Sequence, residues 1–83
     1  MKSHTKDEKY LILLYDLASA TGDPFAECDM YSVGAPLGLH ERTVDNIVKL
    51  LAQTNFIRKR SGTLIALTPH GEALVRTLKS DIR

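Results

Sequence analysis

Apolar residues recur every three or four positions between residues 6 and 20, which is the spacing of a helix with one buried face. Thr5 and Glu8 stand three apart at its start and can form a capping box, in which each side chain binds the backbone N–H of the other residue. Gly22 is placed to end the helix in a left-handed conformation. The predicted buried stripe consists of Leu11, Leu14, Tyr15 and Ala18.

Three more apolar residues widen the apolar surface of this first helix beyond one face: Ile12, Leu13 and Leu17. Either the rest of the chain nearly surrounds the helix, or part of the helix meets a second copy of the protein. We favour the second copy, because small domains often gain stability by pairing. The expected assembly is a homodimer that forms through the first and last helices.

A second helical pattern is expected from Met30 to Leu37, with Asp29 as its cap, and a third from about Glu41 to Thr54, with His40 as its cap. Pro36 lies late in the second helix, where it removes a backbone donor and clashes with the preceding turn. We therefore expect the second helix to be short or distorted at its end. The inward stripe of the third helix is Val44, Ile47, Val48 and Leu51.

Two glycines between these helices indicate how the helices meet. Gly34 offers no side chain where the third helix would lean on the second, and Gly38 tolerates the positive φ of a tight turn. Leu37 and Leu39 flank that turn as inward-pointing residues. A corner between any two helices can contain one glycine between leucines, but two glycines in register with this apolar pattern favour a helix-turn-helix.

After Asn55, which suits a left-handed turn out of the third helix, two β-prone segments surround a Ser61-Gly62 turn and predict a short hairpin. Thr68 and Pro69 then begin a last helix, as cap and first-turn residue. The buried side of that helix is predicted to be Leu74, Val75, Leu78 and Ile82.

The predicted fold is therefore mainly α with a small β-hairpin, in the order helix, helix, helix, hairpin, helix. This order resembles the winged helix-turn-helix DNA-binding domain of bacterial and archaeal transcription regulators: a three-helix core, a short wing and a C-terminal helix. The stretch Leu67-Thr68-Pro69-His70-Gly71 is similar to the L-T-x-x-G junction that follows the wing in MarR-like regulators. The resemblance covers roughly residues 8–80, and it implies sequence-specific binding to double-stranded DNA by a small transcription regulator.

Length and composition fit one domain that spans residues 1–83. Hydrophobic residues make up 43% of the chain and charged residues 25%, as in ordinary globular proteins. Residues 1–37 hold three Lys and six acids, a balance of −3, whereas residues 38–83 hold eight Lys or Arg and four acids, a balance of +4. A scatter of solvated charges could produce this difference, but a protein with one face toward a polyanion would also show it.

If the third helix buries its apolar stripe, its other side exposes a set of polar and charged residues. Arg42 and Asn46 stand four apart on one line, and they are suited to guanine and adenine edges in a major groove. Thr43 suits a phosphate or a thymine methyl group, and Lys49 suits a phosphate. Asp45 is unfavourable near phosphate, which leaves a solvated helix face as the alternative interpretation. The candidate residues are Glu41, Arg42, Thr43, Asp45, Asn46 and Lys49.

The predicted hairpin supplies a second candidate DNA contact. Alternation along the strand sends Arg58 and Arg60 to one face and Lys59 to the other, and Ser61 and Thr63 add neutral donors near the tip. In the winged-helix family the wing lies along the DNA backbone or in the minor groove, where Arg is favoured. The alternative is a charged edge strand that prevents sheet-to-sheet aggregation.

The sequence offers no catalytic, metal or cofactor motif. His4, His40 and His70 are widely separated, and Cys28 has neither a second cysteine nor a histidine close by in the sequence. The polar start and the lack of a long apolar run predict a cytoplasmic protein without a signal peptide or membrane span. The alternative to DNA binding is a winged-helix protein–protein interaction module, which the near-neutral net charge of +1 favours.

Overall fold

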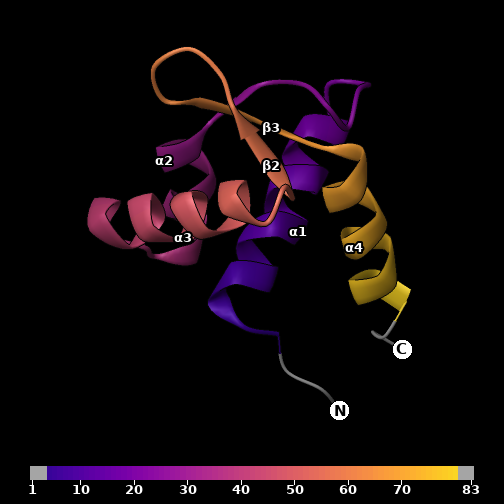
Figure 1. Ribbon diagram of the computed structural model, residues 1–83, viewed down its shortest axis with the longest axis horizontal. Coiled ribbons are helices and arrows are strands. Elements are labelled where there is room, and N and C mark those ends of the chain that lie inside the picture. The colour runs from indigo at the N-terminus through magenta and orange to yellow at the C-terminus, as the bar shows by residue number, and fades with distance from the viewer. Residues whose placement is uncertain (1–3, 81–83) are drawn as a thin grey trace.

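The computed structural model describes residues 4–80, which form a mainly α structure with a small antiparallel sheet (Figure 1). The sheet has three strands in the order β1-β3-β2, and the hairpin β2–β3 follows the third helix. This arrangement is compatible with a winged-helix-like topology. In chain order the elements are α1 (Lys6–Ser19), β1 (Cys28–Asp29), α2 (Met30–Gly34), the 3-10 turn η1 (Ala35–Leu37), α3 (Glu41–Gln53), β2 (Ile57–Lys59), β3 (Leu64–Leu67) and α4 (Pro69–Ser80).

The first helix begins with the predicted capping box. The Thr5 hydroxyl accepts from the backbone N–H of Glu8 at 3.2 Å, and the Glu8 carboxylate accepts from the backbone N–H of Thr5 at 2.8 Å. Leu11, Leu14 and Ala18 are buried as predicted, while Tyr15 is half-buried. The helix ends at Ser19, and Gly22 follows with a φ of 100°.

The surplus apolar residues of α1 are mostly covered by the chain itself. Ile12 and Leu13 are half-buried and pack against the core, and only Leu17 is exposed, at 38%. The interpretation of a nearly surrounded helix therefore explains two of these three residues without a second copy.

The corner between α2 and α3 follows from the two glycines and Pro36. A Cβ at Gly34 would collide with Cγ2 of Val44, so the absence of a side chain lets the two helices cross closely. Gly38 has a φ of 70°, the left-handed conformation predicted for the turn. The α-helical part of the second helix ends at Gly34, and Pro36 lies in η1, as its missing donor predicts.

Helix caps around this corner are partly as predicted. The Asp29 carboxylate accepts from the backbone N–H of Ser32 at 2.9 Å and caps α2. His40 occupies the N-cap position of α3, but its side chain makes no capping hydrogen bond. At the other end of α3, Asn55 has a φ of 65°, as expected for its exit from the helix.

The sheet contains a strand that the sequence pattern does not predict. β1 comes before α2 and pairs with β3, with Cys28 opposite Ile65 and Asp29 opposite Leu64. The predicted hairpin is present, and in it Ile57 lies opposite Leu67, Arg58 opposite Ala66 and Lys59 opposite Ile65. Its second strand begins at Leu64, so Thr63 belongs to the loop.

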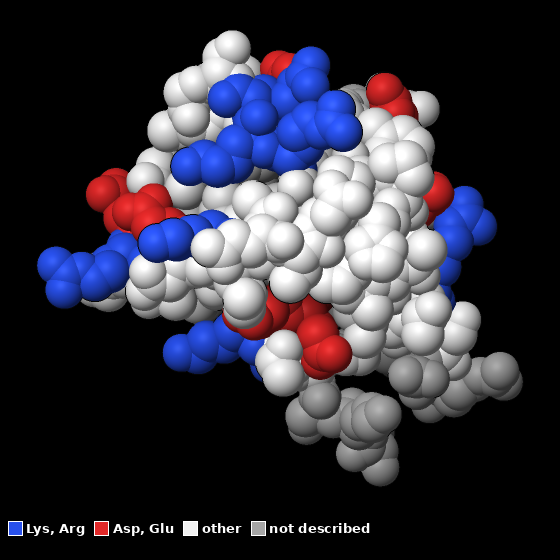
Figure 2. Space-filling view, viewed as in Figure 1, with Lys and Arg blue, Asp and Glu red and all other residues white. Residues whose placement is uncertain are grey.

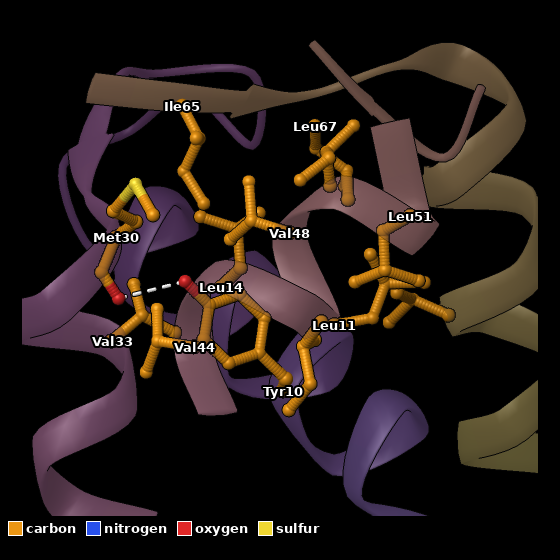
Figure 3. Packing of buried hydrophobic residues seen from close by; sticks show 13 residues of the cluster. Tyr10, Leu11, Leu14, Met30, Val33, Val44, Val48, Leu51, Ile65 and Leu67 are labelled. Carbon is orange, nitrogen blue, oxygen red and sulfur yellow. Dashed lines mark hydrogen bonds between the residues drawn. The ribbon is translucent and has the colours of Figure 1, made fainter. Parts of the chain in front are cut away.

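The core lies where α1, α2 and α3 meet one side of the sheet and α4 (Figure 3). The dashed line in Figure 3 marks the hydrogen bond that the buried Tyr10 hydroxyl donates to the Met30 carbonyl, at 2.7 Å. In α4, Val75 and Leu78 are buried and Leu74 is half-buried, while Ile82 lies outside the described residues. Within residues 4–80, no helix is long and apolar enough to cross a membrane.

Candidate nucleic-acid interface

One side of α3 is buried and the opposite side is exposed and polar. Val44, Ile47, Val48 and Leu51 enter the core as predicted. Arg42, Asn46 and Lys49 are exposed along the opposite line of the helix, Glu41 is exposed beside them, and Thr43 is half-buried. The line continues to Gln53, which is also exposed and stands four positions after Lys49. Gln53 is absent from the predicted set, although its spacing alone places it on this face.

Asp45 has a partner within the protein. The Tyr31 hydroxyl of α2 donates a hydrogen bond to Oδ1 of Asp45 at 2.6 Å, and this bond raises the pKa of Tyr31 to about 12. The carboxylate therefore fixes α3 against α2, and it is only partly available to a ligand. The sequence gives no indication of this pair, because its members lie 14 positions apart in different helices.

The hairpin places its three cations on two sides of the sheet. Arg58 and Arg60 line one depression on the outer side, together with Phe25 and Pro69. Lys59 is exposed at the end of β2 and shares its strand face with the buried Ile57. The predicted division of the three cations between two faces is therefore present.

One of these cations is already paired. Nε of Arg60 lies 3.0 Å from Oε2 of Glu27, in the segment that precedes β1, and both side chains are partly exposed. Such an exposed pair stabilises the fold weakly, by about 0–1 kcal/mol. It nevertheless directs part of the Arg60 guanidinium toward the protein, so that Arg58 and Lys59 are the more available cations of the hairpin.

The hairpin loop is tied to the rest of the molecule through Thr63. Its hydroxyl donates to the Asp29 carboxylate, and its carbonyl accepts from the Met30 N–H at 3.0 Å. The hydrogen bond from Thr63, with a second one from the Ser32 N–H, lowers the pKa of Asp29. Ser61 is exposed at the turn, where its carbonyl accepts from the Leu64 N–H at 3.0 Å. Thr63 thus holds the loop against the start of α2, and Ser61 leaves its side chain at the surface.

The charges on the face that shows α3 and the hairpin are unevenly distributed (Figure 2). Lys and Arg side chains gather over the hairpin, further cations lie on the side of α3, and acidic side chains lie beside and below α3. A mostly uncharged zone separates the cations over the hairpin from the acids below α3, while further acids lie at the top beside the hairpin cations and further cations lie below α3. Such an arrangement would attract a polyanion to one part of this face only.

His40 borders the candidate surface, because it lines a depression with Glu41, Arg42, Thr43 and Asp45 at the start of α3. The other two histidines and the cysteine have structural surroundings. The His70 ring stacks on Phe56 with 4.6 Å between ring centroids, and Nδ1 of His4 lies 3.7 Å from Glu8. Partial burial raises the pKa of the Cys28 thiol. Over the part of the chain that the structure describes, no group of three or more His, Cys, Asp or Glu side chains is placed to hold a metal ion.

Comparison of the chain with protein-family models, with curated proteins and with solved structures finds no match. The candidate interface therefore rests on the geometry and charge of its own residues.

Proposed function

We propose that the protein is a winged helix-turn-helix that binds double-stranded DNA in a sequence-specific manner and acts as a small transcription regulator. In this proposal α3 enters the major groove and the hairpin contacts the backbone beside it. The observation that carries the proposal is the exposed line of Arg42, Asn46 and Lys49 on a helix whose other side is firmly buried.

The chemistry of the exposed line suits the two parts of a DNA contact. Arg42 can bind guanine O6 and N7 with two hydrogen bonds, and Asn46 can do the same with adenine N6 and N7. Lys49 and the hairpin residues Arg58 and Lys59 carry full charges on flexible, exposed side chains, which suits contacts to phosphate. The helix of 13 residues is roughly 20 Å long, which is enough to lie in a major groove.

The proposal predicts binding that depends strongly on salt. With about four cations available in each copy, the logarithm of the affinity should fall by roughly 3–4 for each tenfold rise in salt. Fluorescence anisotropy with a labelled random duplex measures this slope. Failure of the protein to bind at micromolar concentration in low salt would favour the alternative, a module that binds protein instead of DNA.

Sequence specificity is tested separately, by selecting bound duplexes from a random pool. The Arg42→Ala variant should lose discrimination at one base position, by about 1–3 kcal/mol, because the bidentate contact to guanine is lost. Lys59→Ala is the matched control, since loss of a phosphate contact should weaken all sequences about equally. An unchanged preference in Arg42→Ala would count against the proposed placement of α3.

A further inference from the structure

An apolar groove lies between the first half of α1, the end of α3 and the middle of α4, and none of the proposed DNA contacts lines it. Its volume is about 260 Å³. This is slightly below the roughly 300–1,000 Å³ of pockets that enclose a small molecule, and the groove is open to solvent, so that its size suits one or two protruding side chains. Its apolar walls are Leu11, Leu50, Leu51, Phe56 and Leu74.

Leu50 is exposed without a structural reason. Three large apolar side chains are exposed in residues 4–80, and Leu50 is the most exposed of them at 45%. It stands four positions after Asn46 on α3, at the border of the polar line, and it belongs neither to the core nor to the proposed base contacts. Leu50 is continuous with the other apolar walls of the groove, and contiguous exposed apolar surface, unlike a single exposed leucine, indicates an interaction site.

The wall of the groove is already formed. The Phe56 ring is held from one side by the His70 ring, which lies parallel to it within 4°. The Phe56 carbonyl also accepts from the Thr68 N–H at 3.1 Å, and this bond fixes the backbone beside the ring. Because this wall is already ordered in the free protein, binding of a partner loses less conformational entropy there.

The rim of the groove is acidic, and none of the residues that line it is cationic. Asp7 and Glu8 stand at the edge, in the first turn of α1. The Glu8 carboxylate is engaged in the capping box, whereas the Asp7 carboxylate makes no hydrogen bond or ion pair with another residue in the described range 4–80. The nearby cations Lys6 and Lys9 line a different depression, on the side of η1.

We infer that this groove docks a basic amphipathic helix of a partner protein, with an apolar side chain against Leu50 and Phe56 and a Lys or Arg beside Asp7. A helix that lays apolar side chains into such a groove is a general mode of peptide recognition. The inference goes beyond DNA binding and does not depend on it, because none of the groove residues belongs to the proposed DNA contacts.

The test uses two labelled model peptides that share one leucine stripe at positions i, i+3, i+4 and i+7. One peptide carries Lys on its flanks and the other carries Glu. The Lys peptide should bind the protein at least about tenfold more tightly than the Glu peptide at low salt. Leu50→Gln should weaken the Lys peptide about tenfold, because it removes the central apolar contact.

Two control variants separate the groove from general surface effects. Leu17→Gln changes the other exposed leucine, at 38% exposure, and should leave peptide binding unchanged. Asp7→Asn should reduce the preference for Lys over Glu, whereas Asp23→Asn, which keeps the acceptor for the Phe25 N–H, should not. Circular dichroism melting confirms that each variant is folded.

Three outcomes would overturn the inference: no binding of either peptide at about 1 mM, equal binding of both peptides, or equal losses in Leu50→Gln and Leu17→Gln. If neither peptide binds but the protein self-associates, and Leu50→Gln abolishes that self-association, the groove would be assigned to a second copy instead.

Random-duplex binding is measured on the same Leu50→Gln protein and should change less than twofold, so that failure of the DNA proposal and failure of the groove proposal can be told apart.

Discussion

Gly34 is the single residue on which the geometry of the corner most depends. The space that a side chain would fill at this position is occupied by Val44 of α3, so any larger residue forces the helices apart. The backbone of Gly34 is itself helical, with a φ of −74°, and does not need glycine. The requirement is therefore steric, and it belongs to the pair Gly34 and Val44.

Gly34→Ala should destabilise the fold by about 1–2 kcal/mol, because overpacking outweighs the gain in helix propensity. Urea unfolding measures the loss. Gly38→Asn is the control. Position 38 has a left-handed φ of 70°, which Asn tolerates, and no atom lies near the position of the added Cβ, so this variant should lose less than about 1 kcal/mol of stability. A Gly34→Ala protein as stable as the wild type would contradict the proposed contact. Val44→Ala combined with Gly34→Ala should cost less than the sum of the two single changes.

The residues that sequence spacing could identify are those whose role is local. Gly38 and Asn55 have positive φ, and Thr5 and Asp29 cap their helices, because each role depends on neighbours within four positions. Contacts across the fold could not be identified this way. Glu27 pairs with Arg60 across 33 positions, and no local pattern connects the two.

At the scale of elements, two tyrosine hydroxyls form hydrogen bonds between helices, one from α1 to α2 and one from α2 to α3. Tyr10 of α1 donates to the carbonyl of Met30, the first residue of α2, and Tyr31 of α2 donates to Asp45 of α3. Burial, with the nearby acidic groups, raises the pKa of Tyr10 well above its usual value, and the hydrogen bond to Asp45 raises the pKa of Tyr31 to about 12. Both helix contacts therefore require a protonated tyrosine.

These pKa values predict a loss of stability in alkaline solution. A tyrosine in the unfolded chain ionises near pH 10, and both folded values are higher, so the folded state holds its protons longer. The stabilising effect is complete below about pH 10 and is lost as the pH rises from there toward the folded values. Urea midpoints between pH 8 and 11 should fall above pH 10 in the wild type.

The variant with Tyr10→Phe and Tyr31→Phe should be less stable at neutral pH, but its midpoint should depend less on pH. The pKa of Cys28 is also raised, so ionisation of this thiol also lowers the stability of the fold above about pH 9. Both proteins keep Cys28, so its contribution cancels when their pH curves are compared. Parallel pH curves for the two proteins would show that the tyrosines do not control the transition.

Element boundaries show which parts of the fold a pattern can predict. The buried stripe of α3 and the hairpin turn follow from spacing and turn residues, and both are present. The pattern does not predict β1, because two residues are too few for an alternation, and this strand exists only through its pairing with β3. The same pairing places Asp29 next to the hairpin, where it binds Thr63, so a candidate wing residue has a structural partner.

At the scale of the whole molecule, the position of α3 relative to the surface formed by α1 and α4 determines how two copies would bind one DNA site. α1 and α4 lie side by side (Figure 1). Nζ of Lys79 lies 2.5 Å from Asp16 and 5.0 Å from the centre of the Tyr15 ring, which joins the two helices into one surface. Leu17 is exposed on α1 and would be the apolar contact in the expected homodimer.

If the expected homodimer forms through α1 and α4, a copy of 36 × 26 × 23 Å leaves room for the two α3 helices to lie ~34 Å apart, the length of one turn of DNA. A pseudo-palindrome with half-site centres about 10 base pairs apart should therefore bind two copies cooperatively. Insertion of about five base pairs should abolish the cooperativity, because the second half-site then faces the opposite side of the duplex. Sedimentation of the free protein measures dimer formation, and titration of the two duplexes measures cooperativity.

Leu17→Gln should shift the free protein toward monomer and reduce cooperativity without changing the affinity for a single half-site. A monomeric wild type that binds both duplexes equally would exclude this dimer.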